Sequence, residues 1–146
     1  MKWIVTLVLL MTTVAGAQDL TCFFGKEFAG VEVSKRFDHV EIGGVFAVDY
    51  FLDTSDMSDL DLDIEDNYEG LAVKLHALEE DSTIDPFIGY TPLIRQGDFD
   101  KVYHIMEAGV MVNLTDSVGV GVSYVHGDDM IKDDQWMIRF RPIRFK

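Results

Sequence analysis

Cysteine and basic side chains are scarce in this chain. Cys22 is the only cysteine, so the sequence excludes a disulfide framework and a cysteine-based metal site. Lys and Arg number 12 against 26 Asp and Glu, which gives a formal net charge of −14. This charge disfavours binding to nucleic acid or to anionic lipid surfaces. We therefore expect no nucleic-acid partner.

The chain also lacks a hydrophobic run long enough for a transmembrane helix. Its one apolar run, residues 3–14, is shorter than the ~20 residues that a helix needs to span a bilayer. Lys2 precedes this run and the small residues 15–17 follow it, and these are the three regions of a secretory signal peptide. We expect cleavage after Ala17 and a single domain over residues 18–146.

Motifs for nucleotides and metals are missing as well. The glycines lie inside alternating segments and form no phosphate loop or dinucleotide fingerprint, so we expect no cofactor. His39, His76 and His104 fall on different predicted strands, without the short spacing typical of metal ligands. The sequence contains no convincing amphipathic helix.

What the sequence does contain is period-two alternation, most clearly over residues 102–126. Apolar side chains alternate there with small or polar ones, which predicts two strands joined by the turn Thr115-Asp116-Ser117. A slip of one residue would exchange the two faces, so the pattern also predicts the register. The expected pairs are Leu114 with Val118, Val112 with Val120, Val110 with Val122 and Ala108 with Tyr124.

The same alternation predicts further strands over residues 19–25, 29–36, 39–52, 70–78, 84–94 and 135–145. Together with the hairpin they make about eight. Repeated strands separated by turn signals predict an all-β fold, a closed antiparallel up-and-down β-barrel. The longer connections expected at 53–69, 95–101 and 127–134 alternate with tight ones. That alternation is typical of outer-membrane barrels.

The two faces of the predicted strands differ in composition. One face carries Val, Ile, Leu, Phe and Tyr with hardly a charge, which suits hydrocarbon, and the other carries mostly Gly, Ala and Ser. Small side chains suit the narrow interior of an eight-stranded barrel. A few charges share this small face and should form a paired network that plugs the lumen, because an unpaired buried charge is costly. These charges are Glu32, Glu41, Lys74, Glu107, Arg139 and Arg141.

Residues 53–69 contain eight acids and no base. Like charges at this density favour solvent, so we expect a mostly solvated outer loop, with part of it extended as strand. Its alternating acids Asp59, Asp61, Asp63 and Glu65 are the candidates for calcium binding. An EF-hand match fails, because Ile64 stands where the glycine belongs and Gly70 where the bidentate Glu belongs. We expect no specific metal site, and contact of this loop with an external protein or a cation.

The signal peptide, the alternating strands, the LTDSVGVGVSY segment and the last strand with its arginines and aromatics resemble the small bacterial outer-membrane barrels of the OmpA/OmpX-like group. This resemblance implies a monomeric barrel in the outer membrane, in contact with its lipid. The chain departs from that group at its end. It finishes Arg144-Phe145-Lys146, and Pro142 interrupts the alternation of the last strand.

His126 is the one candidate for catalysis. The stretch His126-Gly127-Asp128-Asp129 bears a weak resemblance to PagL-type lipid A deacylases, in which a serine follows the histidine by two residues. Here Asp128 takes the serine's place, no Glu follows at a matching point in the last strand, and Ser123 falls on the opposite face. We therefore expect a non-enzymatic protein with a structural or surface-interaction role. The alternatives are a lipid A-modifying acyl hydrolase and a secreted soluble barrel that binds an apolar ligand.

Overall fold

The computed structural model describes residues 18–53, 61–127 and 134–145. The predicted signal peptide, residues 1–17, lies outside these ranges. The described chain is all β, and no helix in it is long and apolar enough to cross a membrane. Its strands are β1 (Asp19–Phe24), β2 (Phe28–Phe37), β3 (Val40–Asp53), β4 (Asp61–His76), β5 (Ile84–Arg95), β6 (Asp98–Asn113), β7 (Gly119–Gly127) and β8 (Gln135–Arg144).

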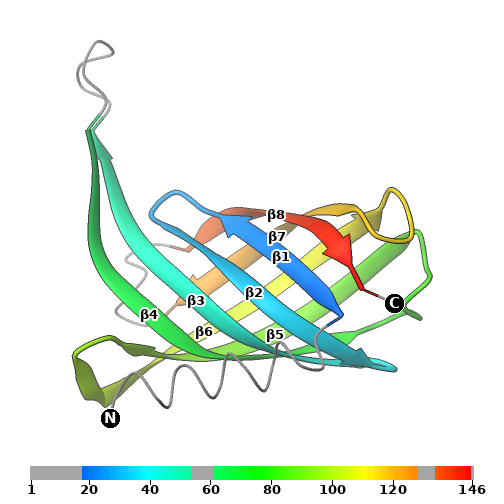
Figure 1. Ribbon diagram of the computed structural model, residues 1–146, viewed down its shortest axis with the longest axis horizontal. Helices are drawn as coiled ribbons and strands as arrows, with labels where there is room; N and C mark the ends of the chain where they lie inside the picture. Colours follow the sequence, from blue (N-terminus) through cyan, green and yellow to red (C-terminus); the bar gives the residue numbers. More distant parts are fainter. Residues whose placement is uncertain (1–17, 54–60, 128–133, 146) are drawn as a thin grey trace.

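The strands form one closed antiparallel barrel in chain order, with β1 paired to β8, as predicted (Figure 1). The predicted hairpin is β6–β7, and its ladder contains Ala108↔Tyr124, Val110↔Val122 and Val112↔Val120. The fourth expected pair closes the turn, where the Leu114 amide donates to the Val118 carbonyl at 2.9 Å. The register prediction is therefore confirmed.

Connection lengths differ from the prediction. We call the end of the barrel that holds the first residue of β1 and the last residue of β8 the terminal end. The turn between β6 and β7 lies at this end as well. The opposite end, where β3 ends and β4 begins, is named the hairpin end after the β3–β4 hairpin. The expected loop at 95–101 is a two-residue turn between β5 and β6, in which Gly97 takes a positive φ of 93°. The terminal end instead contains the longer connection 77–83. Long and short loops therefore do not alternate as expected, because β5 and β6 continue into the loop predicted at 95–101 and β4 ends before its predicted limit.

The largest of these differences is in the acidic stretch. Residues 61–69 belong to β4, and β3 reaches Asp53, so the described part of the predicted 53–69 loop is strand. Carboxylates on alternate residues of a strand point to the same face, and here that face is open to solvent. Figure 1 shows the β3–β4 hairpin extending beyond the other strands at the hairpin end. The acidic side chains Asp63 and Glu65 are exposed to solvent, while the backbone of this stretch is paired with β3.

The predicted apolar outer face is confirmed, whereas the inner face carries large apolar side chains as well as the small ones that were expected. Large apolar side chains such as Val122, Ile138 and Phe140 point outward and are 50 %, 63 % and 40 % exposed. The small residues line the inside, where neighbouring side chains fill the space beside them. A Cβ added to Gly109 would lie 2.7 Å from Phe87 Cζ and 2.7 Å from Ser123 Cβ. The lumen is therefore packed rather than open.

Candidate functional site

The charged lumen is the most distinctive site of the described chain. Five acids and five bases are buried inside the barrel, together with His76. The acids are Asp19, Glu32, Glu41, Asp85 and Glu107, and the bases are Arg36, Lys74, Arg139, Arg141 and Arg144. The charges of these two sets balance, so the acid excess of the chain lies outside the lumen.

Arg139 of β8 occupies the centre of the network. Its Nη2 donates to both carboxylate oxygens of Glu107 on β6, at 2.6 and 2.5 Å, and its Nε lies 3.1 Å from Glu107 Oε2. The guanidinium also lies over the rings of Phe23 and Phe87, at 5.3 and 5.5 Å from their centroids. A planar guanidinium suits this combination of forked hydrogen bonds and ring faces. The pair joins β8 to β6, across the intervening strand β7.

Lys74 of β4 forms the second pair of the central layer. Its Nζ donates to Glu32 of β2 and lies 3.6 Å from Glu41 Oε1 on β3. Glu32 is also 3.6 Å from Arg139 Nη1, so this carboxylate lies between two cations. Gly89 faces this layer, and a Cβ there would lie 3.0 Å from Glu107 Cγ and 3.2 Å from Lys74 Cγ. A larger residue at this position would push the charged side chains aside.

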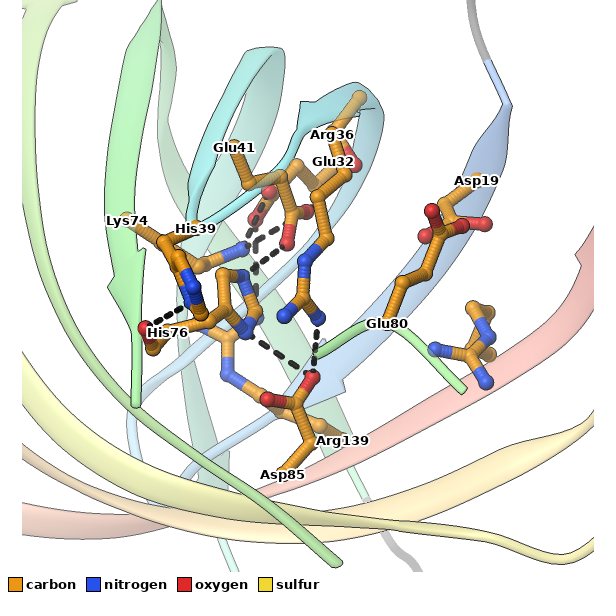
Figure 2. Close-up of polar contacts among 12 residues, drawn as sticks. Asp19, Glu32, Arg36, His39, Glu41, Lys74, His76, Glu80, Asp85 and Arg139 are labelled. Atoms are coloured by element: carbon orange, nitrogen blue, oxygen red, sulfur yellow. Dashed lines mark hydrogen bonds and ion pairs between the residues drawn. The ribbon is translucent and has the colours of Figure 1, made fainter. Parts of the chain in front are cut away.

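A third group of contacts, drawn in Figure 2, surrounds His76, which ends β4 at the terminal end of the barrel. His76 is hydrogen-bonded at both ring nitrogens, with Nδ1 2.9 Å from Asp85 Oδ2 and Nε2 2.7 Å from Glu41 Oε2. Arg36 Nη1 donates to the same Asp85 oxygen at 2.6 Å. Ser34 Oγ donates to Glu41 at 2.5 Å. The cluster therefore ties β2, β3, β4 and β5 together through side chains.

The two remaining buried bases, Arg141 and Arg144, both lie on β8. Arg144 near the end of the chain donates to both oxygens of Asp19, with Nε at 2.8 Å and Nη2 at 3.1 Å. This pair links β8 with β1. Arg141 donates to Asn113 Oδ1 at 2.5 Å and to the Ser117 carbonyl at 3.1 Å, so it stabilises the β6–β7 turn rather than binding Glu41 or Glu107.

The hairpin half of the lumen is apolar. A cluster of buried side chains fills it, comprising Phe23, Phe28, Val45, Ala47, Tyr68, Ala72, Leu93, Tyr103, Ile105, Val125 and Met137. Two cavities inside the barrel, one lined mainly by this cluster and one by the charged groups, each measure about 20 Å³. A space of that size holds about one water molecule. The charged layer and the apolar cluster together obstruct the axis of the barrel.

His126 lies on the outside of the barrel, two-thirds exposed, while Ser123 is buried and accepts a bond from Arg139 Nε at 3.3 Å. The histidine has an acid partner that sequence reasoning missed, because His126 Nδ1 lies 2.5 Å from Asp134 Oδ1. Tyr124 donates to the other oxygen of Asp134 at 3.2 Å, and its ring packs edge-on against Trp136. Residues 128–133 lie outside the described ranges, and they include Asp128, which stands in the place of the serine of PagL-type deacylases.

Three of the four calcium candidates lie on a strand. Asp61, Asp63 and Glu65 lie on β4, and Asp59 is outside the described residues. Within the described ranges, no group of three or more His, Cys, Asp or Glu side chains is arranged to hold a metal ion. The acids and bases of the lumen are instead paired with one another.

All six charges that the sequence placed in the lumen are buried there. Five of them form one network, Glu32, Glu41, Lys74, Glu107 and Arg139. Arg141 binds the β6–β7 turn instead. Sequence reasoning did not include Arg36, His76 and Asp85 in the network. The parity of Arg36 with Glu32, and of His76 with Lys74, was the available signal. Asp85 was harder to assign, because Pro86 and Pro92 obscured the alternation of β5.

Comparisons with protein-family models, with curated proteins and with solved structures found no match to this chain.

Proposed function

We propose that this chain is a small integral outer-membrane barrel whose lumen is sealed and whose β3–β4 hairpin makes contacts outside the membrane. The observation that carries the proposal is the inverted distribution of side chains. Among the described residues, 27 large apolar side chains are exposed, whereas 16 buried residues are polar or charged against 13 that are hydrophobic. A surface of this kind is a liability in water and suits the hydrocarbon of a bilayer.

Closure supports the same proposal. A sheet without free edges satisfies its backbone groups internally, which lipid requires of any spanning structure. The start of β1 and the end of β8 lie at the same end of the barrel, as an even number of antiparallel strands dictates. The sealed axis favours a structural or interaction role over conduction. The cavities of about 20 Å³ also weigh against a soluble barrel that binds an apolar ligand.

A charged substitution on the outward face tests the membrane proposal. Val122 lies in the middle of β7 and is half exposed. If this face contacts lipid, Val122→Lys should cost about 2–4 kcal/mol at mid-membrane depth and reduce the protein recovered in the outer-membrane fraction. In water the same change at an exposed site would be nearly neutral.

Glu79→Lys on the 77–83 connection is the matched control, because it places a lysine at an exposed site outside the strands. The readouts are membrane fractionation and migration on a gel with and without heating. Unchanged folding of Val122→Lys, together with a protein that is soluble after lysis without detergent, would refute the proposal.

A second candidate function follows from the contact between His126 and Asp134. A carboxylate bound to Nδ1 orients an imidazole and leaves Nε2 as a general base, an arrangement that acyl hydrolases use. Mass spectrometry of membrane lipids after expression tests this candidate, with wild type compared with His126→Ala and Asp134→Asn. Loss of a lipid acyl chain in wild type alone would support it. Identical lipids in all three samples would exclude it.

A further inference from the structure

The β3–β4 hairpin leaves strand edges without partners. The β2–β3 ladder ends at Phe28↔Asp49, and the β4–β5 ladder starts at Tyr68↔Arg95. Beyond these levels the ladders of the described residues join β3 and β4 only to each other, from Tyr50↔Ile64 to Asp53↔Asp61. The Tyr50 amide at the base also donates to the Glu27 carbonyl at 2.9 Å. We call this extension the ribbon. Figure 1 shows it standing clear of the remaining strands.

The unpaired edge of β4 is longer than that of β3. Over residues 61–66, β4 has no ladder to β5. Backbone contact on this side begins at Asn67, whose carbonyl accepts a hydrogen bond from the Gln96 amide. At about 3.3 Å per residue this edge is roughly 20 Å long. A row of unpaired backbone donors and acceptors of this length is a template for another strand.

The two faces of this edge carry different chemistry. Leu62 and Ile64 share one face and are 57 % and 55 % exposed. Asp63 lies on the other face and is exposed, and so is Glu65, which falls at the irregularity between the pairs Tyr50↔Ile64 and Asp49↔Asp66. On β3, Tyr50 lies opposite Ile64, and the exposed ring of Phe51 lies opposite Asp63, so the acids of this face are on β4 alone. The edge therefore alternates apolar and acidic side chains.

Arg95 at the base of the ribbon does not offset the charge of this edge. Its guanidinium lies 3.5 Å from Asp66 and 3.1 Å from Asp98, so it is already shared between two acids. A strand added to the β4 edge would place its side chains opposite these two faces in turn. Cross-strand neighbours of opposite charge attract, and apolar neighbours pack together. The complementary strand therefore alternates basic and apolar residues.

We propose that the edge of β4 over residues 61–66 takes up, by strand addition, an extended segment of another protein in which basic and apolar residues alternate. The inference rests on the proposed function, in that it assigns a binding mode and a partner chemistry to the external hairpin. Backbone hydrogen bonds would supply affinity, and the two faces would supply selectivity. Because the charges are exposed, binding weakens as ionic strength rises.

The experiment uses the full chain, folded in micelles of an uncharged detergent, and a fluorescent peptide of about eight residues that alternates lysine and valine, a length that covers the edge. Binding is followed by fluorescence anisotropy. Two further peptides serve as controls. One alternates glutamate and valine, and the other is the lysine peptide with alternate backbone nitrogens methylated, which removes its donors on one edge.

We expect the lysine peptide to bind and both control peptides to bind at least about tenfold more weakly, a loss of about 1.4 kcal/mol. The variant Asp63→Lys with Glu65→Lys should lose binding to a similar extent, because attraction becomes repulsion. The matched variant, Glu79→Lys with Asp81→Lys, has the same change in net charge at the terminal end and should bind like wild type.

Equal binding of the methylated peptide would overturn strand addition, and equal loss in the matched variant would overturn the assignment to the ribbon. No binding of the lysine peptide would mean that the acids only protect the edge from association, and would overturn the proposal. None of these outcomes depends on the membrane assignment, which fractionation and Val122→Lys test separately.

Discussion

Replacing Glu107 by Gln removes one charge from the centre of the lumen and changes the shape of the side chain little. Glu107 is 7 % exposed and receives three contacts from Arg139, at 2.5, 2.6 and 3.1 Å. Arg139 is 4 % exposed. Without the carboxylate, the guanidinium keeps Glu32 at 3.6 Å as its nearest acid, and Lys74 already binds that acid. The variant therefore leaves a buried cation without adequate compensation.

The magnitude follows from this arrangement. Breaking a buried ion pair by removing one partner costs about 3–5 kcal/mol, because the remaining charge stays buried and unpaired. Gln retains one carbonyl oxygen that accepts from Arg139, so we expect a loss near the lower limit, about 3 kcal/mol. The free energy of unfolding falls by that amount.

Two comparisons separate the ion pair from general damage. Glu107→Leu combined with Arg139→Met removes both charges, and such replacements are often close to neutral, so we expect the double variant to be more stable than Glu107→Gln. Asp98→Asn breaks the ion pair with Arg95. The side chain of Asp98 is 37 % exposed and that of Arg95 is 35 % exposed. An exposed pair contributes about 0–1 kcal/mol, so this control should change little.

Urea unfolding in detergent, followed by tryptophan fluorescence and by the mobility difference between heated and unheated samples on a gel, provides the measurement. Trp136 lies on the outer face of β8, where its emission reports loss of the detergent environment. A Glu107→Gln variant as stable as Asp98→Asn would refute the reasoning that the lumen pair is structural. A double variant less stable than the single one would refute the assignment of the cost to the stranded charge.

Two further predictions concern the closure and the packing of the barrel. Asp19→Asn weakens the link with Arg144 between the first and last strands, and should lower stability by about 1.5–3 kcal/mol, the usual value for hydrogen bonds to a charged group. The unfolding temperature on the heat-modifiability gel should fall accordingly, and an unchanged temperature would show that the seam does not depend on this pair. Gly109→Ala places a Cβ 2.7 Å from Phe87 Cζ and Ser123 Cβ, so overpacking should cost about 1–3 kcal/mol in urea unfolding. Wild-type stability of this variant would mean that the lumen contains more free space than its packing indicates.

Alternation along the strands was sufficient to predict the fold class, the faces and the β6–β7 register. In that hairpin every second residue from Ala108 to Leu114 is apolar, and so is every second residue from Val118 to Tyr124. A displaced register would bring small residues opposite large ones and reverse the faces, so local information alone selects the pairing. The same parity brought Glu41, Lys74, Glu107, Arg139 and Arg141 to one face.

The strand limits at the hairpin end were not predictable in the same way. High acid content over 61–69 and polar residues over 98–101 favoured loops, yet both stretches are strand. β3 pairs with the first stretch, and β5 pairs with Asp98 and Val102 on either side of an irregularity in the second. Backbone pairing outweighs the local preference for solvent when the side chains remain exposed. The alternation of Asp61 and Asp63 with Leu62 and Ile64 was the signal that strand continues.

The sequence by itself thus determined which side chains face the lumen and which face outward, since a period of two leaves no other arrangement along one strand. Only the tertiary structure decided the partners. Arg36 binds Asp85, 49 residues away, and Asp19 binds Arg144, 125 residues away. Such contacts depend on the stagger of strands around a closed barrel, which parity does not specify. The contact between His126 and Asp134 arose in the same way, from the pairing of β7 with β8.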